Sequence, residues 1–167
     1  MAEEQRTLTA LVVEDDESLR ESLITALSVY FPYLNIQTAV NGEDAYNKIK
    51  LQKPDILYTD VRMPIMSGDQ LLEKLVEEQV KIPTFVVTAA PSTDQSISAI
   101  SYSHMMYTDD LLVKLGTYFN RKLQEHGGVN RKENLAFTVI PKPFDLLELV
   151  DRTQAVLNVV YGIDTNI

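Results

Sequence analysis

The chain has 167 residues, of which 45% are hydrophobic and 23% are charged, a composition typical of one folded globular domain. It has no cysteine, no apolar run long enough to span a membrane and no N-terminal signal-peptide pattern, so we expect a soluble cytoplasmic protein without disulfides or thiolate chemistry. The formal net charge of −9 opposes the phosphate backbone of nucleic acids, and we therefore expect no direct nucleic-acid binding.

Short apolar segments alternate with amphipathic segments along the chain. The apolar segments are rich in β-branched residues and predict buried strands, which lie at Thr9–Val13, Asn35–Ala39, Ile56–Thr59, 83–87 and 135–140. Segments with helical periodicity follow them, at 19–30, 43–51, from about 69 to 76, and at 144–161. Asn41 and Gly42 indicate a turn before the second helix, and Pro64 places residues 62–68 in a loop.

Alternating strands and helices, with strands that are apolar on both faces, predict a parallel sheet covered by helices on each side. We expect a single α/β domain over residues 1–167 with the flavodoxin-like, doubly wound five-stranded sheet in the order 2-1-3-4-5. The stretch 91–134 interrupts the alternation after the fourth strand. Its repeated leucines at 112, 115 and 123 predict an extra helix within an insertion.

Polar residues stand at the ends of four predicted strands. Glu14 and Asp15 follow the first strand, Asp60 the third, Thr88 the fourth, and Lys142 comes just after the last. The carboxyl ends of parallel strands meet at one edge of the sheet, and ligands bind there where the strand order reverses. These side chains are therefore expected to converge in a crevice between the first and third strands.

The chemistry of this group points to phosphoryl transfer. Crowded carboxylates repel one another unless a cation neutralises them, and oxygen ligands without cysteine or histidine favour Mg²⁺. An aspartate beside such an ion can act as a nucleophile and form an acyl phosphate. We expect Asp60 to be that nucleophile, Lys142 to neutralise the transferred oxygens and Thr88 to donate a hydrogen bond.

The same residues lie in segments that resemble the receiver domains of two-component response regulators. The resemblance covers about residues 8–90 and 135–161 and leaves the insertion unmatched. The segments that carry it are Leu11-Val12-Val13-Glu14-Asp15-Asp16, Asp60-Val61-Arg62-Met63-Pro64 with Gly68, Val87-Thr88-Ala89, and Lys142-Pro143-Phe144.

This resemblance implies a stand-alone phosphorylation switch of the bacterial cytoplasm rather than an enzyme with a separate substrate. A histidine kinase or a phosphotransfer protein would donate the phosphoryl group to Asp60, and the domain would assist its own phosphorylation and dephosphorylation. Lys142 would pair with the phosphoryl group, Thr88 would move towards it, and the Lys142–Pro143 peptide bond would be cis. Mg²⁺ would be coordinated by Asp15, Asp60 and the backbone carbonyl of Arg62, with Glu14 assisting through water.

The chain departs from the family pattern in two places. Val139 stands three residues before Lys142, where receivers commonly have an aromatic residue that responds to phosphorylation, and Pro141 precedes the lysine directly. Pro141 removes a backbone donor and therefore predicts that the last strand lies at an edge of the sheet. The insertion 91–134 replaces the region through which receivers dimerise or contact partners, so it is the candidate surface for a downstream protein or a homodimer.

Two other functions fit parts of this pattern. A receiver-shaped adaptor that works without phosphorylation would account for Val139 and for the insertion, although the intact Asp60, Thr88 and Lys142 oppose it. A Mg²⁺-dependent phosphatase with an aspartate nucleophile would resemble a sequence with a second acid two residues after the first. Arg62 occupies that position here.

Overall fold

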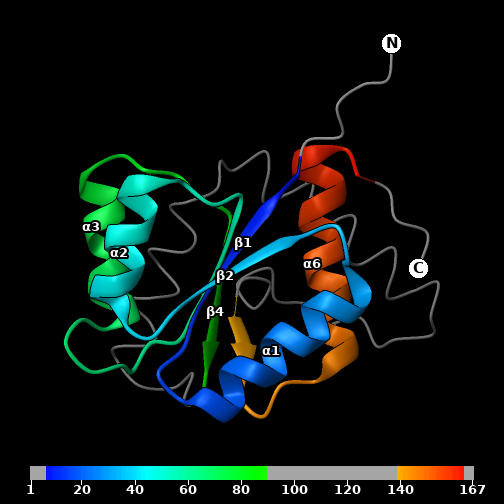
Figure 1. Cartoon of the computed structure of the whole chain (residues 1–167), viewed down its shortest axis with the longest axis horizontal. Helices are drawn as coiled ribbons and strands as arrows, with labels where there is room; N and C mark the ends of the chain where they lie inside the picture. The colour runs from blue at the N-terminus through cyan, green and yellow to red at the C-terminus, as the bar shows by residue number, and fades with distance from the viewer. Residues whose placement is uncertain (1–6, 90–138, 164–167) are drawn as a thin grey trace.

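The computed structural model of the chain describes residues 7–89 and 139–163. In these ranges five parallel strands form one sheet in the order β2-β1-β3-β4-β5, as the sequence predicts (Figure 1). The strands are β1 Thr9–Val13, β2 Asn35–Ala39, β3 Ile56–Thr59, β4 Thr84–Thr88 and β5 Val139–Pro141.

Helices cover both faces of the sheet. Helices α1 and α6 pack together on one face, while α2 and α3 pack together on the other (Figure 1). None of the helices in the described ranges has the length and apolar character of a membrane span. The helices are α1 Glu17–Tyr30, α2 Gly42–Leu51, α3 Gly68–Glu77 and α6 Leu146–Tyr161.

The strands in the middle of the sheet carry the core. Every residue of β1, β3 and β4 is buried, whereas most of the edge strand β2 is at least partly exposed. This pattern follows from the helix layers, because a central parallel strand meets apolar side chains on both faces. The other edge strand is β5, so Pro141 lies where the sheet needs no further donor, as predicted.

A polar side chain begins each described helix. Asp16, Asn41, Ser67 and Asp145 lie at the N-caps, and each accepts a hydrogen bond from a backbone N–H in the first helical turn. Asp16 directly follows Asp15 of the predicted site, and Ser67 ends the loop that begins after Asp60. The helix starts therefore help to determine where the strand-end side chains are held.

The predicted elements agree with the described structure to within a few residues. The predicted Asn41-Gly42 turn is the start of α2, one residue earlier than expected, and α6 begins at Leu146 rather than at residue 144. The Lys142–Pro143 peptide bond is cis, as the family resemblance implies. The predicted insertion 91–134, the helix predicted within it and the first four residues of the predicted last strand lie outside the described residues.

A buried pair of hydroxyl groups joins β3 to α6. The Tyr58 hydroxyl in β3 lies 2.7 Å from the Thr153 hydroxyl in α6, and the Tyr58 ring stacks on Phe85 of β4. Both hydroxyl-bearing residues are fully buried, so neither group can exchange this bond for water. Tyr58 stands two residues before Asp60, and the contact therefore connects the strand that carries Asp60 to a helix that covers the sheet.

Tyr58→Phe is predicted to lower the free energy of unfolding by about 1–2 kcal/mol, because it leaves the Thr153 hydroxyl buried without this partner. Thr153→Val should cost a similar amount. The double variant should cost clearly less than the sum, since both changes remove one shared bond. Urea unfolding followed by circular dichroism measures all three, and strictly additive losses would contradict the shared bond.

Candidate functional site

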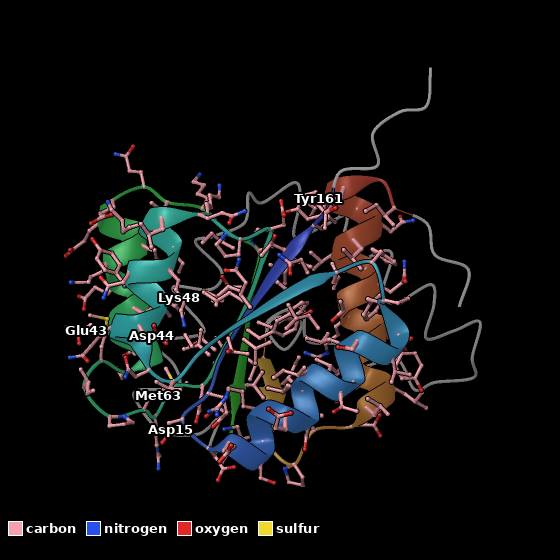
Figure 2. The ribbon with its side chains drawn as sticks, viewed as in Figure 1. Asp15, Glu43, Asp44, Lys48, Met63 and Tyr161 are labelled. Carbon is pink, nitrogen blue, oxygen red and sulfur yellow. The ribbon has the colours of Figure 1, made fainter. Side chains whose placement is uncertain are left out.

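The carboxyl edge of β1 supplies two acids in different environments. Glu14 is 1% exposed, and its backbone N–H continues the sheet by donating to the Ala39 carbonyl at 3.1 Å. Asp15 is exposed and lies at the lower edge of the sheet in Figure 2, whereas Tyr161 lies at the opposite end. Asp16 then caps α1, which stops the chain from extending further along β1.

Asp60 occupies the corresponding end of β3. Its backbone N–H donates to the Val13 carbonyl at 3.0 Å, so β1 and β3 remain paired up to the first residue of the site. The carboxylate is largely buried, and its Oδ1 accepts the Val61 N–H at 2.6 Å. A carboxylate held by its own following amide has a defined orientation, which suits a group that must react at one oxygen.

Lys142 brings the fifth strand into the site. Its backbone N–H donates to the Thr88 carbonyl at 2.9 Å, which anchors the residue beside β4. Its Nζ donates to Asp60 Oδ2 at 2.8 Å and forms an ion pair with Glu14 Oε2 at 2.7 Å. Burial alone lowers the pKa of Lys142, but the hydrogen bond to Asp60 and the ion pair with Glu14 outweigh it and hold the pKa above its usual range.

Burial has the opposite effect on Glu14. It raises the pKa of the Glu14 carboxyl above its usual range, although the Lys142 ammonium acts to lower it and the Asp60 charge adds to the rise. Glu14 Oε2 is buried and accepts no hydrogen bond within the described part of the chain, despite its close approach to Lys142. The other oxygen, Glu14 Oε1, accepts the Asp16 N–H at 3.3 Å, so the Lys142 ammonium is the main compensation for the charge at Oε2.

Glu14, Asp15 and Asp60 form a group of oxygen ligands. One carboxylate oxygen from each lies within 4.8 Å of the other two. Two of the three carboxylates, Glu14 and Asp60, pair with the single ammonium of Lys142, so negative charge is left in excess in the group. A divalent cation would cancel that excess, and an all-oxygen donor set with one exposed member matches Mg²⁺, which keeps part of its water shell.

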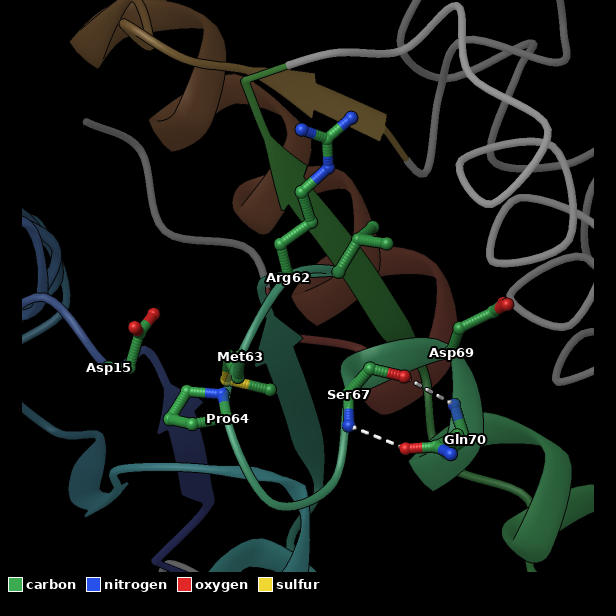
Figure 3. Close-up of a pocket in the computed structure, with 8 residues that line it drawn as sticks. Asp15, Arg62, Met63, Pro64, Ser67, Asp69 and Gln70 are labelled. Atoms are coloured by element: carbon green, nitrogen blue, oxygen red, sulfur yellow. Dashed lines mark hydrogen bonds between the residues drawn. The ribbon is translucent and has the colours of Figure 1, made fainter.

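The predicted site residues are thus brought to one edge of the sheet. Glu14, Asp15, Asp60 and Lys142 lie together, and Thr88 is buried at the end of β4, where its carbonyl holds Lys142. Arg62 lies in the loop between β3 and α3, and its side chain extends away from the Asp15 carboxylate in Figure 3. The role of its carbonyl as a metal ligand stays a prediction.

A pocket lies beside the acids, at the edge of the sheet where a crevice is expected from the sequence, but its lining by the start of α3 was not predicted. It lies between Asp15 and the β3–α3 loop, and Figure 3 shows Ser67 and Gln70 at its far side, joined by two hydrogen bonds of 3.0 and 3.2 Å. These bonds form a capping box at the start of α3. The spacing of a serine and a glutamine three residues apart is a recognised signature and could have identified this helix start from the sequence.

Two further contacts around the acids were also missed. Arg20 in α1 donates from Nη1 to the Glu14 carbonyl at 2.8 Å, and Gly68 lies so close to Asp60 that a Cβ there would meet the Asp60 carbonyl at 1.9 Å. The helical periodicity of α1 does not reveal that the Arg20 side chain reaches back to the Glu14 carbonyl. Gly68 belongs to the resemblance pattern, but the pattern alone gives no reason for its small size.

The sequence matches receiver domains in two comparisons, one with a family model and one with individual relatives. The family model described as "Response regulator receiver domain" matches residues 10–114, which includes part of the segment that the sequence predicts to be inserted. A protein-glutamate methylesterase/protein-glutamine glutaminase from Clostridium acetobutylicum is 30% identical over 162 residues, which cover 95% of this chain and 38% of that protein. The chain spans from 20% to 50% of the length of such curated relatives.

Solved structures share the fold at low sequence identity. The receiver domain of an HD domain-containing protein from Pseudomonas fluorescens has a TM-score of 0.66 at 17% identity, covering 95% of this chain and all of that one. A CheX–CheY–BeF3–Mg²⁺ complex from Borrelia burgdorferi gives a TM-score of 0.61 at 20% identity, covering 90% and 89%. With the matching family model and the sheet order, these results show that the chain belongs to the response regulator receiver domain family.

Proposed function

We propose that this chain is a phosphorylation-controlled signalling switch that accepts a phosphoryl group on Asp60. The observation that carries the proposal is the position of Asp60, which contacts Lys142 at 2.8 Å within a group of three carboxylates. A nucleophile, a cation for the transferred oxygens and a set of oxygen ligands are the parts that phosphoryl transfer requires. The structurally similar CheY was solved with BeF3 and Mg²⁺, which supports the same ligand chemistry here.

Mg²⁺ would be held by Asp15, Asp60 and the backbone carbonyl of Arg62, with Glu14 acting through water. The excess negative charge of the three carboxylates supports a cation at this point, because the single Lys142 ammonium is shared between Glu14 and Asp60. When bound, the ion would neutralise charge on the phosphoryl oxygens during transfer. The chain's own residues supply the nucleophile and the orientation.

In the proposed step an Asp60 carboxylate oxygen attacks the phosphorus of a phosphohistidine on a histidine kinase or a phosphotransfer protein. A P–O bond forms while the P–N bond breaks, and the imidazole nitrogen keeps the bonding electron pair and takes up a proton. The Val61 N–H orients the attacking carboxylate by its bond to Oδ1. The donor must then place its phosphorus next to Asp60, with the attacking oxygen, the phosphorus and the leaving nitrogen in one line.

Lys142 and Thr88 would recognise the product. The Lys142 ammonium already contacts Asp60, and a phosphoryl group there would offer it oxygens of higher charge than the carboxylate. The Thr88 hydroxyl, at the end of the neighbouring strand β4, would donate to another phosphoryl oxygen. Because Lys142 also pairs with Glu14, phosphorylation at Asp60 would redistribute a buried ion pair as well as add charge.

The output would be contact with a downstream protein or a second copy of the chain. The insertion 91–134 stays the predicted surface for that contact and lies outside the described residues. A phosphorylation-independent adaptor is the second candidate, because β5 has the buried aliphatic residue Val139 where the family resemblance predicts an aromatic readout. The two functions differ in whether Asp60 must be modified.

Incubation of the full chain with Mg²⁺ and acetyl phosphate, followed by intact mass spectrometry, tests the modification. The wild-type protein should gain the mass of one phosphoryl group, and Asp60→Asn should abolish the gain. Asp16→Asn is the matched control, since it changes a nearby acid that caps α1 and lies outside the carboxylate group. An unmodified wild-type protein would contradict the switch and favour the adaptor.

Asp15→Asn should raise the free energy of unfolding by about 1 kcal/mol in the absence of Mg²⁺, because it removes one of three mutually repelling carboxylates. The wild-type protein should gain about 2.7 kcal/mol at a Mg²⁺ concentration about 100 times the dissociation constant, and Asp15→Asn should lose most of that gain. Urea unfolding with and without Mg²⁺ measures both quantities.

Asp16→Asn should change neither quantity appreciably, since asparagine caps a helix as well as aspartate does. Equal Mg²⁺ stabilisation of Asp15→Asn and the wild-type protein would exclude Asp15 as a ligand.

A further inference from the structure

Gly42, the first residue of α2, lies directly against the loop that follows Asp60. Its backbone N–H donates to the Met66 carbonyl at 2.9 Å. A Cβ at this position would lie 2.7 Å from that carbonyl oxygen and 2.9 Å from the Ser67 carbonyl oxygen, closer than a Cβ atom approaches a backbone oxygen. Two backbone segments thus meet where no side chain fits between them.

The conformation of Gly42 does not by itself require glycine. Its φ lies outside the left-handed region, and Gly162 is the only glycine with positive φ in the described ranges. Asn41, the N-cap residue, has an extended backbone and accepts the Asp44 N–H at 2.9 Å, so the pair begins a helix rather than forming a left-handed turn. Glycine in a helix costs conformational entropy. The close approach to the loop is therefore the physical reason for it.

The contacted loop, residues 61–67, contains a strained residue. Ile65 has φ of 70°, a conformation that β-branched side chains rarely adopt, and it is 75% exposed, so packing gives little compensation. The loop keeps this shape through the bond from Met66 N–H to the Pro64 carbonyl at 2.8 Å and through the bond from Gly42. The Gly42 bond comes from another element and fixes the loop relative to α2.

The loop carries groups that determine the geometry of the site. The Val61 N–H holds Asp60 Oδ1 at 2.6 Å, and Arg62 provides the backbone carbonyl proposed as a metal ligand. At its other end the Gly68 N–H donates to the Val61 carbonyl at 3.0 Å, so displacement near Met66 is transmitted to the first residues of the loop. Figure 3 shows Arg62, Met63 and Pro64 following one another along the pocket.

We propose that Gly42 is a positioning residue for the metal and phosphoryl site: its close approach and its N–H hold the strained 61–67 loop in the conformation that binds the cation. This inference rests on the proposed function. It adds a residue on α2, outside the carboxyl edges of β1 and β3, on which Mg²⁺ affinity depends. Residues that orient metal ligands typically change metal affinity by roughly 10- to 100-fold when they are altered.

The test compares Gly42→Ala with Gly162→Ala in the full chain. Gly162, at the C-terminus of α6, has φ of 68°, and a Cβ there would have no neighbouring atom within 4 Å, so alanine introduces backbone strain far from the loop. Titration of Mg²⁺ followed by NMR of backbone amides gives the dissociation constant of the folded protein. Gly42→Ala should raise it by about tenfold or more. Gly162→Ala should leave it within about twofold of the wild-type value.

The Val61 amide resonance supplies a structural readout, because this N–H contacts Asp60. It should shift in Gly42→Ala and not in Gly162→Ala, with or without metal. Wild-type Mg²⁺ affinity and an unshifted Val61 amide in Gly42→Ala would overturn the proposal, as would equal losses of affinity in both variants. If the wild-type protein binds no Mg²⁺, the proposed function fails, whereas the Val61 shift still decides the role of Gly42.

Hydrogen exchange in the wild-type protein provides a test that does not depend on the variant folding. If the Gly42 contact favours cation binding, then cation binding must favour the contact by the same free energy. Saturating Mg²⁺ should therefore slow exchange of the Gly42 amide by a larger factor than exchange of the Gly162 amide, which is bonded to the Asn158 carbonyl within α6. Equal slowing of the two amides would overturn the proposal.

Discussion

Two buried carboxylates, Asp60 and Glu14, share one ammonium, which lies 2.8 Å from the first and 2.7 Å from the second. Burying these charges is costly, and Lys142 offsets the cost only in part because Asp15 adds a third carboxylate to the group. The geometry of the sheet enforces this crowding, since β1, β3 and β5 end at the same edge. This excess of negative charge is the physical basis of our proposal that a cation binds beside Asp60.

The crowding of charge at this edge also explains why the loop that follows Asp60 makes so many close backbone contacts. A carboxylate that must react at a defined oxygen needs fixed neighbours, and the Val61 amide, the Gly68 backbone and the Gly42 amide each contribute to that fixation. The strained Ile65 lies within this set of contacts. Strain of this kind persists only where surrounding contacts determine the backbone, as they do between α2 and the start of α3.

The fold and the main site residues could be predicted from the sequence because both follow from local patterns. Buried strands such as Thr9–Val13 are evident from their apolar composition, and parallel topology then places Glu14, Asp60 and Lys142 at one edge. The direct Glu14–Lys142 ion pair and the approach of Gly42 to Met66 could not be predicted. They depend on distances between elements that are remote in sequence, which neither periodicity nor spacing encodes.

We propose that Asp60 accepts a phosphoryl group beside a cation held by its neighbouring acids. A crystal structure of the full chain with Mg²⁺ and beryllium fluoride, a stable analogue of the phosphoryl group, tests it most directly. We expect the fluoride adduct on Asp60, Mg²⁺ bound to Asp15 and Asp60, and the Lys142 ammonium contacting fluorine rather than Glu14. An unmodified Asp60 with the Lys142–Glu14 pair intact at saturating ligand would contradict it.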